Sequence, residues 1–206
     1  MSPRMFLRRR GPLAGIALVL LVLSGCGDDE GVTEPPVVSL LASGWQRFAA
    51  ADYAGAIEKF EDAVESDRGL GEGHNGIGWC YFRLDSLDLA LAEFQTSIAK
   101  GLVGADAQAG RCLILNRMDE YRQAIFAGEA VLAIDPLFKL AADPTVDVRD
   151  VRLAMAQSHL ALGEYAETLD QLTNIDSAIQ INPNSATFVS ELIAAIEHLT
   201  AFLSVY

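Results

Sequence analysis

The stretch Gly44-Trp45-Gln46-Arg47-Phe48 is followed 34 residues later by Gly78-Trp79-Cys80-Tyr81-Phe82. The same shift pairs further positions: Ala56 with Ala90, Ile57 with Leu91, and Phe60 with Phe94; a second shift reaches Ala124 and Ile125. Several matches in one register indicate an internal repeat. Glycine and proline stand mainly between helical stretches, and no alternating run bounded by turns indicates a strand. We therefore expect an all-α array of helical hairpins.

This pattern resembles the tetratricopeptide repeat family, whose signature places glycine and aromatic residues in a first helix and alanine, aromatic, alanine in a second. The matching positions are Gly44, Gly78, Tyr81, Ala56, Ala90, Ala124, Phe60, Phe94, Ala63 and Pro136. The third copy departs from it, because Cys112 replaces the first-helix glycine and Gly128 the second-helix aromatic residue. The resemblance implies a right-handed helical-hairpin solenoid whose first helices line a concave groove.

The repeat domain is predicted to span residues 37–206 and to be interrupted once. Four repeats are expected at about 37–70, 71–104, 105–136 and 149–181, followed by a capping helix at 184–204. Thr168 follows Ala124 by 44 residues, so we place ten extra residues in an insert at 137–148, as either a structural detour or a binding element.

The capping helix carries its apolar residues along one face: Phe188, Leu192, Ile196, Leu199 and Leu203. A terminal repeat leaves an apolar surface open unless something covers it. This face is expected to cover the end of the array, and the alternative is a homodimer formed through the same helix.

The N-terminal segment predicts export and lipidation. Residues 1–25 combine arginines with an apolar run too short to span a bilayer, which is typical of a signal peptide. Leu23-Ser24-Gly25-Cys26 resembles the lipobox of bacterial lipoproteins, which implies a lipid anchor on Cys26; the alternative is an ordinary cleaved signal. An acidic, proline-containing linker follows at 26–36. The predicted location is the periplasmic side of a Gram-negative-type envelope, and Gly27 favours the outer membrane over the inner.

Charge and motif content narrow the function. The chain carries a net charge of −13, and loss of the four signal arginines would leave 11 basic and 28 acidic residues, or −17. Such a surface repels nucleic acid. His74, His159 and His198 show no ligand spacing, and no phosphate loop or nucleophile elbow is present. We expect no enzymatic activity, no metal and no cofactor.

Cys80 and Cys112 fall on the first helices of adjacent repeats. In an oxidising compartment they could form a disulfide. The alternative is that both are small buried residues in a helix seam.

The candidate binding residues follow from the repeat register. The predicted groove set consists of Trp45, Phe48, Trp79, Phe82, Arg83, Asn116 and Arg117. Aromatic residues and arginine are enriched where binding energy concentrates, so the groove is predicted to bind a partner protein or peptide. Three alternatives remain at this point: the aromatics only pack against neighbouring helices, the tryptophans stack on a glycan or small solute, or the array is a structural spacer.

Overall fold

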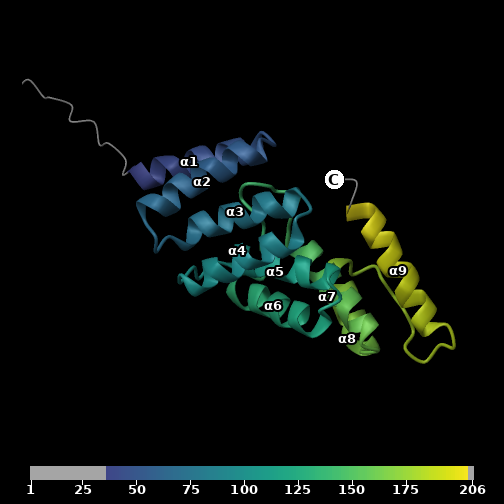
Figure 1. Ribbon diagram of the computed structural model, residues 1–206. Coiled ribbons are helices and arrows are strands. Elements are labelled where there is room, and N and C mark those ends of the chain that lie inside the picture. The colour runs from purple at the N-terminus through teal and green to yellow at the C-terminus, as the bar shows by residue number, and fades with distance from the viewer. Residues whose placement is uncertain (1–35, 204–206) are drawn as a thin grey trace, which may run out of the picture. The chain divides into compact units, whose positions relative to one another are not determined.

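The computed structural model describes residues 36–203; the predicted signal, Cys26 and linker residues 26–35 lie outside this range. The described part is all-α, as predicted (Figure 1). Its helices are α1 (Pro36–Ala49), α2 (Tyr53–Ser66), α3 (Gly71–Arg83), α4 (Leu87–Ala99), α5 (Ala105–Arg117), α6 (Tyr121–Ile134), α7 (Val148–Ala161), α8 (Tyr165–Ile175) and α9 (Phe188–Leu203). None of these helices combines the length and the apolar character that crossing a membrane requires.

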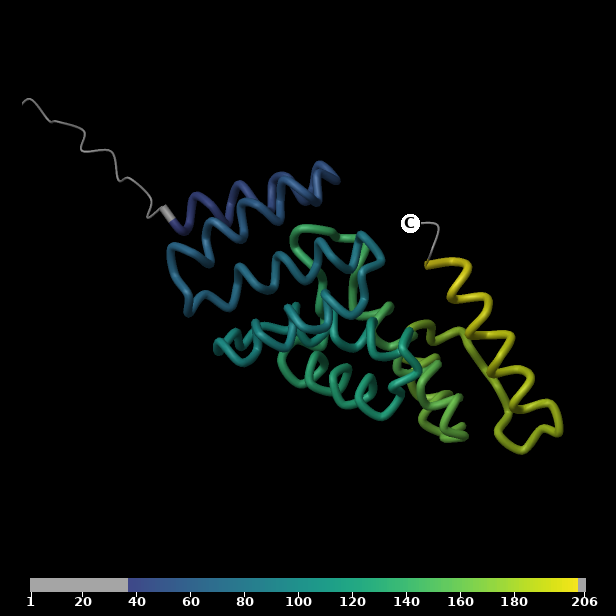
Figure 2. Tube along the Cα trace, viewed as in Figure 1, coloured from purple at the N-terminus to yellow at the C-terminus, as the bar shows by residue number. Residues whose placement is uncertain are grey.

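Helices α1 to α8 pair into four consecutive antiparallel hairpins, which stack in chain order (Figure 2). Each first helix contacts the first helix of the next hairpin, in the order α1, α3, α5, α7. Within residues 36–203, no second helix contacts another second helix. The first helices are therefore closer together and form the inner layer of a solenoid.

The turn inside each hairpin repeats one backbone conformation. Ala51, Asp85, Asp119 and Gly163 all have positive φ, at 59°, 56°, 60° and 76°. Their spacing is 34, 34 and 44 residues, so the extra ten residues lie between Asp119 and Gly163. The positive-φ residues of the turns are thus spaced as the sequence repeats are.

Glycines let the second-helix phenylalanines enter the helix seams. A Cβ atom on Gly44 or Gly76 would lie 2.5 Å from the Phe60 ring. One repeat later, a Cβ on Gly78 or Gly110 would lie 2.8 Å or 2.3 Å from the Phe94 ring. Each ring is completely buried between a glycine of its own hairpin and a glycine of the next hairpin. Close packing of this kind leaves no room for a methyl group.

The third hairpin exchanges these roles, which explains its departure from the repeat pattern. Gly128 stands at the phenylalanine position, and a Cβ there would lie 2.5 Å from Met155 Sδ and 3.2 Å from Cys112 Sγ. The Cys112 and Met155 side chains therefore occupy space that a ring fills in the earlier hairpins. Cys112 in place of the first-helix glycine and Gly128 in place of the second-helix aromatic residue therefore compensate each other.

The segment between α6 and α7 folds back against the first helices. Phe138, Leu140 and Val146 are buried and belong to the main apolar core. An antiparallel bridge pairs Lys139 with Asp147, with hydrogen bonds from Leu140 N to Val146 O (2.9 Å) and from Val148 N to Phe138 O (2.8 Å). The sequence predicts the insert at 137–148; because α7 begins at Val148, we call residues 137–147 the insert. Its buried side chains make it part of the core, which favours the structural alternative for this segment.

The C-terminal helix α9 lies against α7 and α8 (Figure 1). Leu192, Ile196 and Leu199 form a second apolar cluster with residues of α7 and α8, and Phe188 and Leu203 pack at its edge. Gln157 Nε2 also donates to Thr200 Oγ1 at 3.3 Å. The apolar face that could have served a homodimer therefore covers the last hairpin of its own chain.

Candidate functional site

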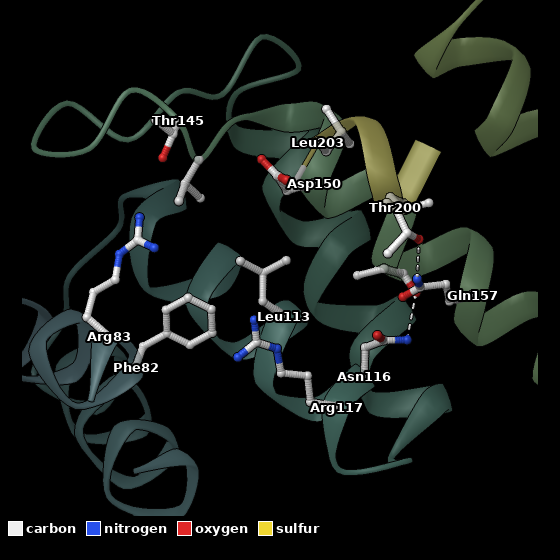
Figure 3. Close-up of a pocket in the computed structure, with 13 residues that line it drawn as sticks. Phe82, Arg83, Leu113, Asn116, Arg117, Thr145, Asp150, Gln157, Thr200 and Leu203 are labelled. Atoms are coloured by element: carbon white, nitrogen blue, oxygen red, sulfur yellow. Dashed lines mark hydrogen bonds between the residues drawn. The ribbon is translucent and has the colours of Figure 1, made fainter. Parts of the chain in front are cut away.

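Two recesses open on the inner layer, and the insert contributes a wall to both. The first is lined by the C-terminal ends of α3 and α5, by α7 and α9, and by Thr145 and Val146 of the insert; its volume is about 570 Å³ (Figure 3). We call it the arginine recess, after Arg83 and Arg117. The second is lined by Trp45, by the N-terminal ends of α3 and α5, and by Leu140 to Ala142 of the insert; its volume is about 510 Å³. We call it the acidic recess, after Glu72 and Asp106.

In the arginine recess, exposed Arg117 lies beside the buried ring of Phe82. The Arg117 guanidinium carbon lies 4.8 Å from the centre of the Phe82 ring, a distance suited to a cation–π contact. Its side chain is 52% exposed, and the nearest carboxylate, that of exposed Asp85, is 3.8 Å away. Because an exposed ion pair at this distance holds an arginine weakly, the Arg117 donors remain available to a ligand.

Arg83 and Asn116 are held more firmly. Arg83 forms an ion pair with Asp143 of the insert. The Asn116 amide nitrogen donates to Ala154 O and to Ser158 Oγ, each at 3.0 Å. Both amide hydrogens of Asn116 are therefore used in joining α5 to α7. Asn116 orients the wall of the recess, and only its carbonyl oxygen is left for a ligand.

Asp150 places a carboxyl group in the same recess. Its Oδ2 accepts a hydrogen bond from Asp147 N at 2.9 Å as part of the capping box of α7. Burial raises the pKa of Asp150 above its usual value of 3.8. Guanidinium donors next to an aromatic wall suit a ligand that offers a carboxylate beside an apolar group.

The structure brings together four of the seven predicted groove residues: Phe82, Arg83, Asn116 and Arg117 all line the arginine recess. Trp45 lies in the acidic recess instead. Phe48 is buried, with its ring 5.6 Å from that of Trp45. Binding by these residues stays a prediction, but they do not form one continuous surface.

The expectation that Trp79 points into the groove is wrong. Its ring is 0% exposed and packs edge-on against Phe82 (5.5 Å) and Phe94 (5.3 Å). Trp45 makes equivalent contacts in its own repeat but is only half-buried. The difference arises because α3 is flanked by α1 and α5, whereas among first helices α1 contacts only α3. A glycan stacked on both tryptophans is therefore excluded by the burial of Trp79.

The disulfide alternative is also corrected. Cys80 and Cys112 are both free thiols and both buried. Burial raises the pKa of each thiol to about 12. A thiol needs its thiolate form to act as a nucleophile or metal ligand, so these cysteines serve as small residues in the helix seams.

Two of the three histidines, His74 and His159, are paired with carboxylates. His74 Nδ1 lies 2.7 Å from Glu93 Oε2, and His159 Nδ1 lies 2.8 Å from Glu164 Oε2. Between residues 36 and 203, no three His, Cys, Asp or Glu side chains are grouped closely enough to hold a metal ion.

Sequence reasoning missed several parts of these recesses. Asp150 of α7 and Thr200 of α9 line the arginine recess, and Asp143 of the insert pairs with Arg83. The acidic recess was missed although a signal was available: Glu72 and Asp106 are 34 residues apart, as are Arg83 and Arg117. The repeat register, which placed Arg83 and Arg117 in the predicted groove set, would also have found Glu72 and Asp106 if it had been applied to acidic residues.

Comparison with known proteins supports the fold. The sequence matches no protein-family model and no curated protein. Among solved structures, a MamA crystal structure is 21% identical with a TM-score of 0.55, covering 80% of this chain and 81% of MamA. YrrB, described as a TPR protein with an unusual peptide-binding site, is 13% identical with a TM-score of 0.59, covering 80% and 78%. The first TPR of Spaghetti (RPAP3), bound to the HSP90 peptide SRMEEVD, is 17% identical with a TM-score of 0.54, covering 62% and 94%. The chain therefore has the fold of tetratricopeptide repeat proteins.

Proposed function

We propose that this protein is a lipid-tethered scaffold that binds a segment of a partner protein in the arginine recess, without covalent chemistry. The observation that carries the proposal is the convergence of Phe82, Arg83 and Arg117 at one open recess of the inner layer. Two of the similar structures are described as binding peptides, which supports the class of ligand. Assembly or secretion at the cell envelope is the process we propose for it.

The partner segment should present a carboxylate beside an apolar side chain. Within residues 36–203, the Arg117 guanidinium pairs only with exposed Asp85, 3.8 Å away. The Phe82 ring lies under that guanidinium. An arginine–carboxylate pair adds geometric specificity to affinity because the two groups form parallel hydrogen bonds. The partner is therefore recognised by its side chains at this recess.

The membrane tether rests on the sequence. Leu23-Ser24-Gly25-Cys26 provides the lipidation signal, and the acidic segment after it provides a spacer before α1. Cys26→Ala protein should leave the membrane fraction, and its retention there after a salt wash would contradict the tether. We place the protein on the periplasmic side, at the outer membrane in preference to the inner.

The binding surface is testable by photo-crosslinking in intact cells. A crosslinking amino acid replaces Thr200, which lines the arginine recess, and in a matched variant it replaces Gln95, which is exposed on second helix α4. A partner should be captured from position 200 and not from position 95. Equal capture at both positions, or capture at 95 alone, would contradict the proposal.

A further inference from the structure

We propose that the acidic recess binds the cationic side chain of an arginine or lysine from the same partner segment. This inference rests on the proposed function and extends it to the second recess. The acidic recess lies at the N-terminal ends of α3 and α5, whereas the arginine recess lies at the C-terminal ends of the same two helices. A partner segment crossing the inner layer would meet both recesses.

The charges that line the acidic recess have a single sign. Glu72 and Asp106 contribute the carboxylates, and no lysine, arginine or histidine is among the lining residues. Burial and the negative charge of Glu72 both raise the pKa of Asp106, with a further contribution from Asp135. The two carboxylates therefore repel each other without a counter-charge in the recess, and a cation placed between them would relieve that repulsion.

Asn75 supplies an independent sign of a missing ligand. Its side chain is only 2% exposed, it lines the acidic recess, and its Oδ1 has no hydrogen-bond partner in the described structure. Buried polar atoms in proteins are almost always hydrogen-bonded, because leaving one unpaired is unfavourable. An N–H donor of a ligand in the recess would satisfy this acceptor.

Trp45 adds an aromatic wall. Its ring is half-buried and lines the recess together with Leu102 and Leu140. Tryptophan is the aromatic residue that binds cations best through its ring face. Apolar walls also suit the methylene stem that leads to an ammonium or guanidinium group.

The occupant is an organic cation and not a metal ion. Among residues 36–203, no group of three metal-ligating side chains is close enough to hold a metal. Two carboxylates, one amide oxygen and an indole ring instead match a group with several N–H donors and a diffuse charge. The recess volume, about 510 Å³, falls within the range of ligand pockets.

The first test uses Trp45 as the reporter. The chain has two tryptophans, so Trp79→Phe leaves Trp45 as the single tryptophan, excited selectively at wavelengths that tyrosine does not absorb, in the detergent-solubilised full-length protein. Acetyl-arginine amide should change Trp45 fluorescence saturably, with half-saturation on the order of millimolar because so small a probe makes few contacts. Acetyl-citrulline amide, its uncharged counterpart, should give no saturable change. Equal responses to the two probes, or no response to either, would overturn the proposal.

The second test removes the recess charges. Glu72→Gln with Asp106→Asn should weaken the arginine-amide response at least tenfold, whereas Glu58→Gln, on the exposed surface of α2, should leave it unchanged. The same double variant should also lower partner crosslinking from position 200. If the double variant crosslinks the partner from position 200 as well as the parent does, although the parent shows the fluorescence response, the recess binds free cations and not a side chain of the partner. That result would overturn the proposal. Crosslinking at 200 without any fluorescence response would overturn this inference and leave the proposed function standing.

Discussion

The two recesses are built from the same repeat positions and carry opposite charges. Glu72 and Asp106 stand in the first turns of α3 and α5, and Arg83 and Arg117 stand in the last turns of the same helices. Negative charge at a helix N-terminus and positive charge at a helix C-terminus both interact favourably with the helix macrodipole. Repetition of one hairpin thus places an acidic pair at one end of the inner layer and a basic pair at the other. Insert residues line both recesses, so the partner segment that we propose would face two surfaces of opposite charge.

The largest expected effect comes from the insert that separates the recesses. Phe138→Ala should lower the free energy of unfolding by about 3–5 kcal/mol, because the ring is buried in the core and truncation leaves a cavity. Denaturant unfolding measures it. The neighbouring Leu137 is 83% exposed, so Leu137→Ala should change stability by no more than about 0.5 kcal/mol. Similar losses for the two variants would show that the insert is not part of the core.

The next effect concerns α5, which contributes to both recesses. Gly110→Ala should destabilise the protein by about 1–3 kcal/mol, because the new methyl would meet the Phe94 ring at 2.3 Å. A Cβ on Gly104, just before α5, would meet nothing within 4 Å. Gly104→Ala is therefore the matched control, and thermal unfolding of the two variants should separate them. Equal melting temperatures would contradict the packing described for Phe94.

Much of this arrangement could be predicted from the sequence, because glycine, aromatic and alanine positions fixed 34 residues apart determine which helices pair. The 44-residue step from Ala124 to Thr168 predicts the insert. Its return over the inner layer depends on the long-range burial of Phe138 and Leu140. The register also placed Trp45 and Trp79 on the same face. It could not show that Trp79 has a helix on each side. Trp45 and Trp79 are equivalent in the repeat but differ in burial, because they have different numbers of neighbouring helices.

Removing a guanidinium should affect binding more than stability. Arg117→Gln should lower partner crosslinking from position 200 about 10- to 100-fold, because a hydrogen bond to a charged group contributes about 1.5–3 kcal/mol. The free energy of unfolding should change by less than about 1 kcal/mol, since the Arg117–Asp85 pair is exposed. Arg122→Gln, on α6 and 79% exposed, is the control. Equal crosslinking in the two variants would remove Arg117 from the binding surface.

The smallest expected effect is a pH dependence in the acidic recess. Burial and the charge of Glu72 raise the pKa of Asp106 above 3.8, so the folded protein binds this proton more tightly than the unfolded chain. Stability from this group is present below pH 3.8 and is lost as the pH rises through the raised value. Asp106→Asn should therefore be at least as stable as the parent at pH 7, and its advantage should disappear in acid. Urea unfolding at several pH values measures this difference; a variant less stable at pH 7 would contradict it.

The most direct test of the central claim is to map where one partner segment crosslinks on the inner layer. Photo-crosslinkers at Thr200 in the arginine recess and at Ala141 in the acidic recess are compared by mass spectrometry of the captured peptides. We predict that both positions capture the same partner segment, with an acidic residue near position 200 and a basic residue near position 141. Capture of unrelated segments, or capture no stronger than that from Gln95 on the outer layer, would contradict the account.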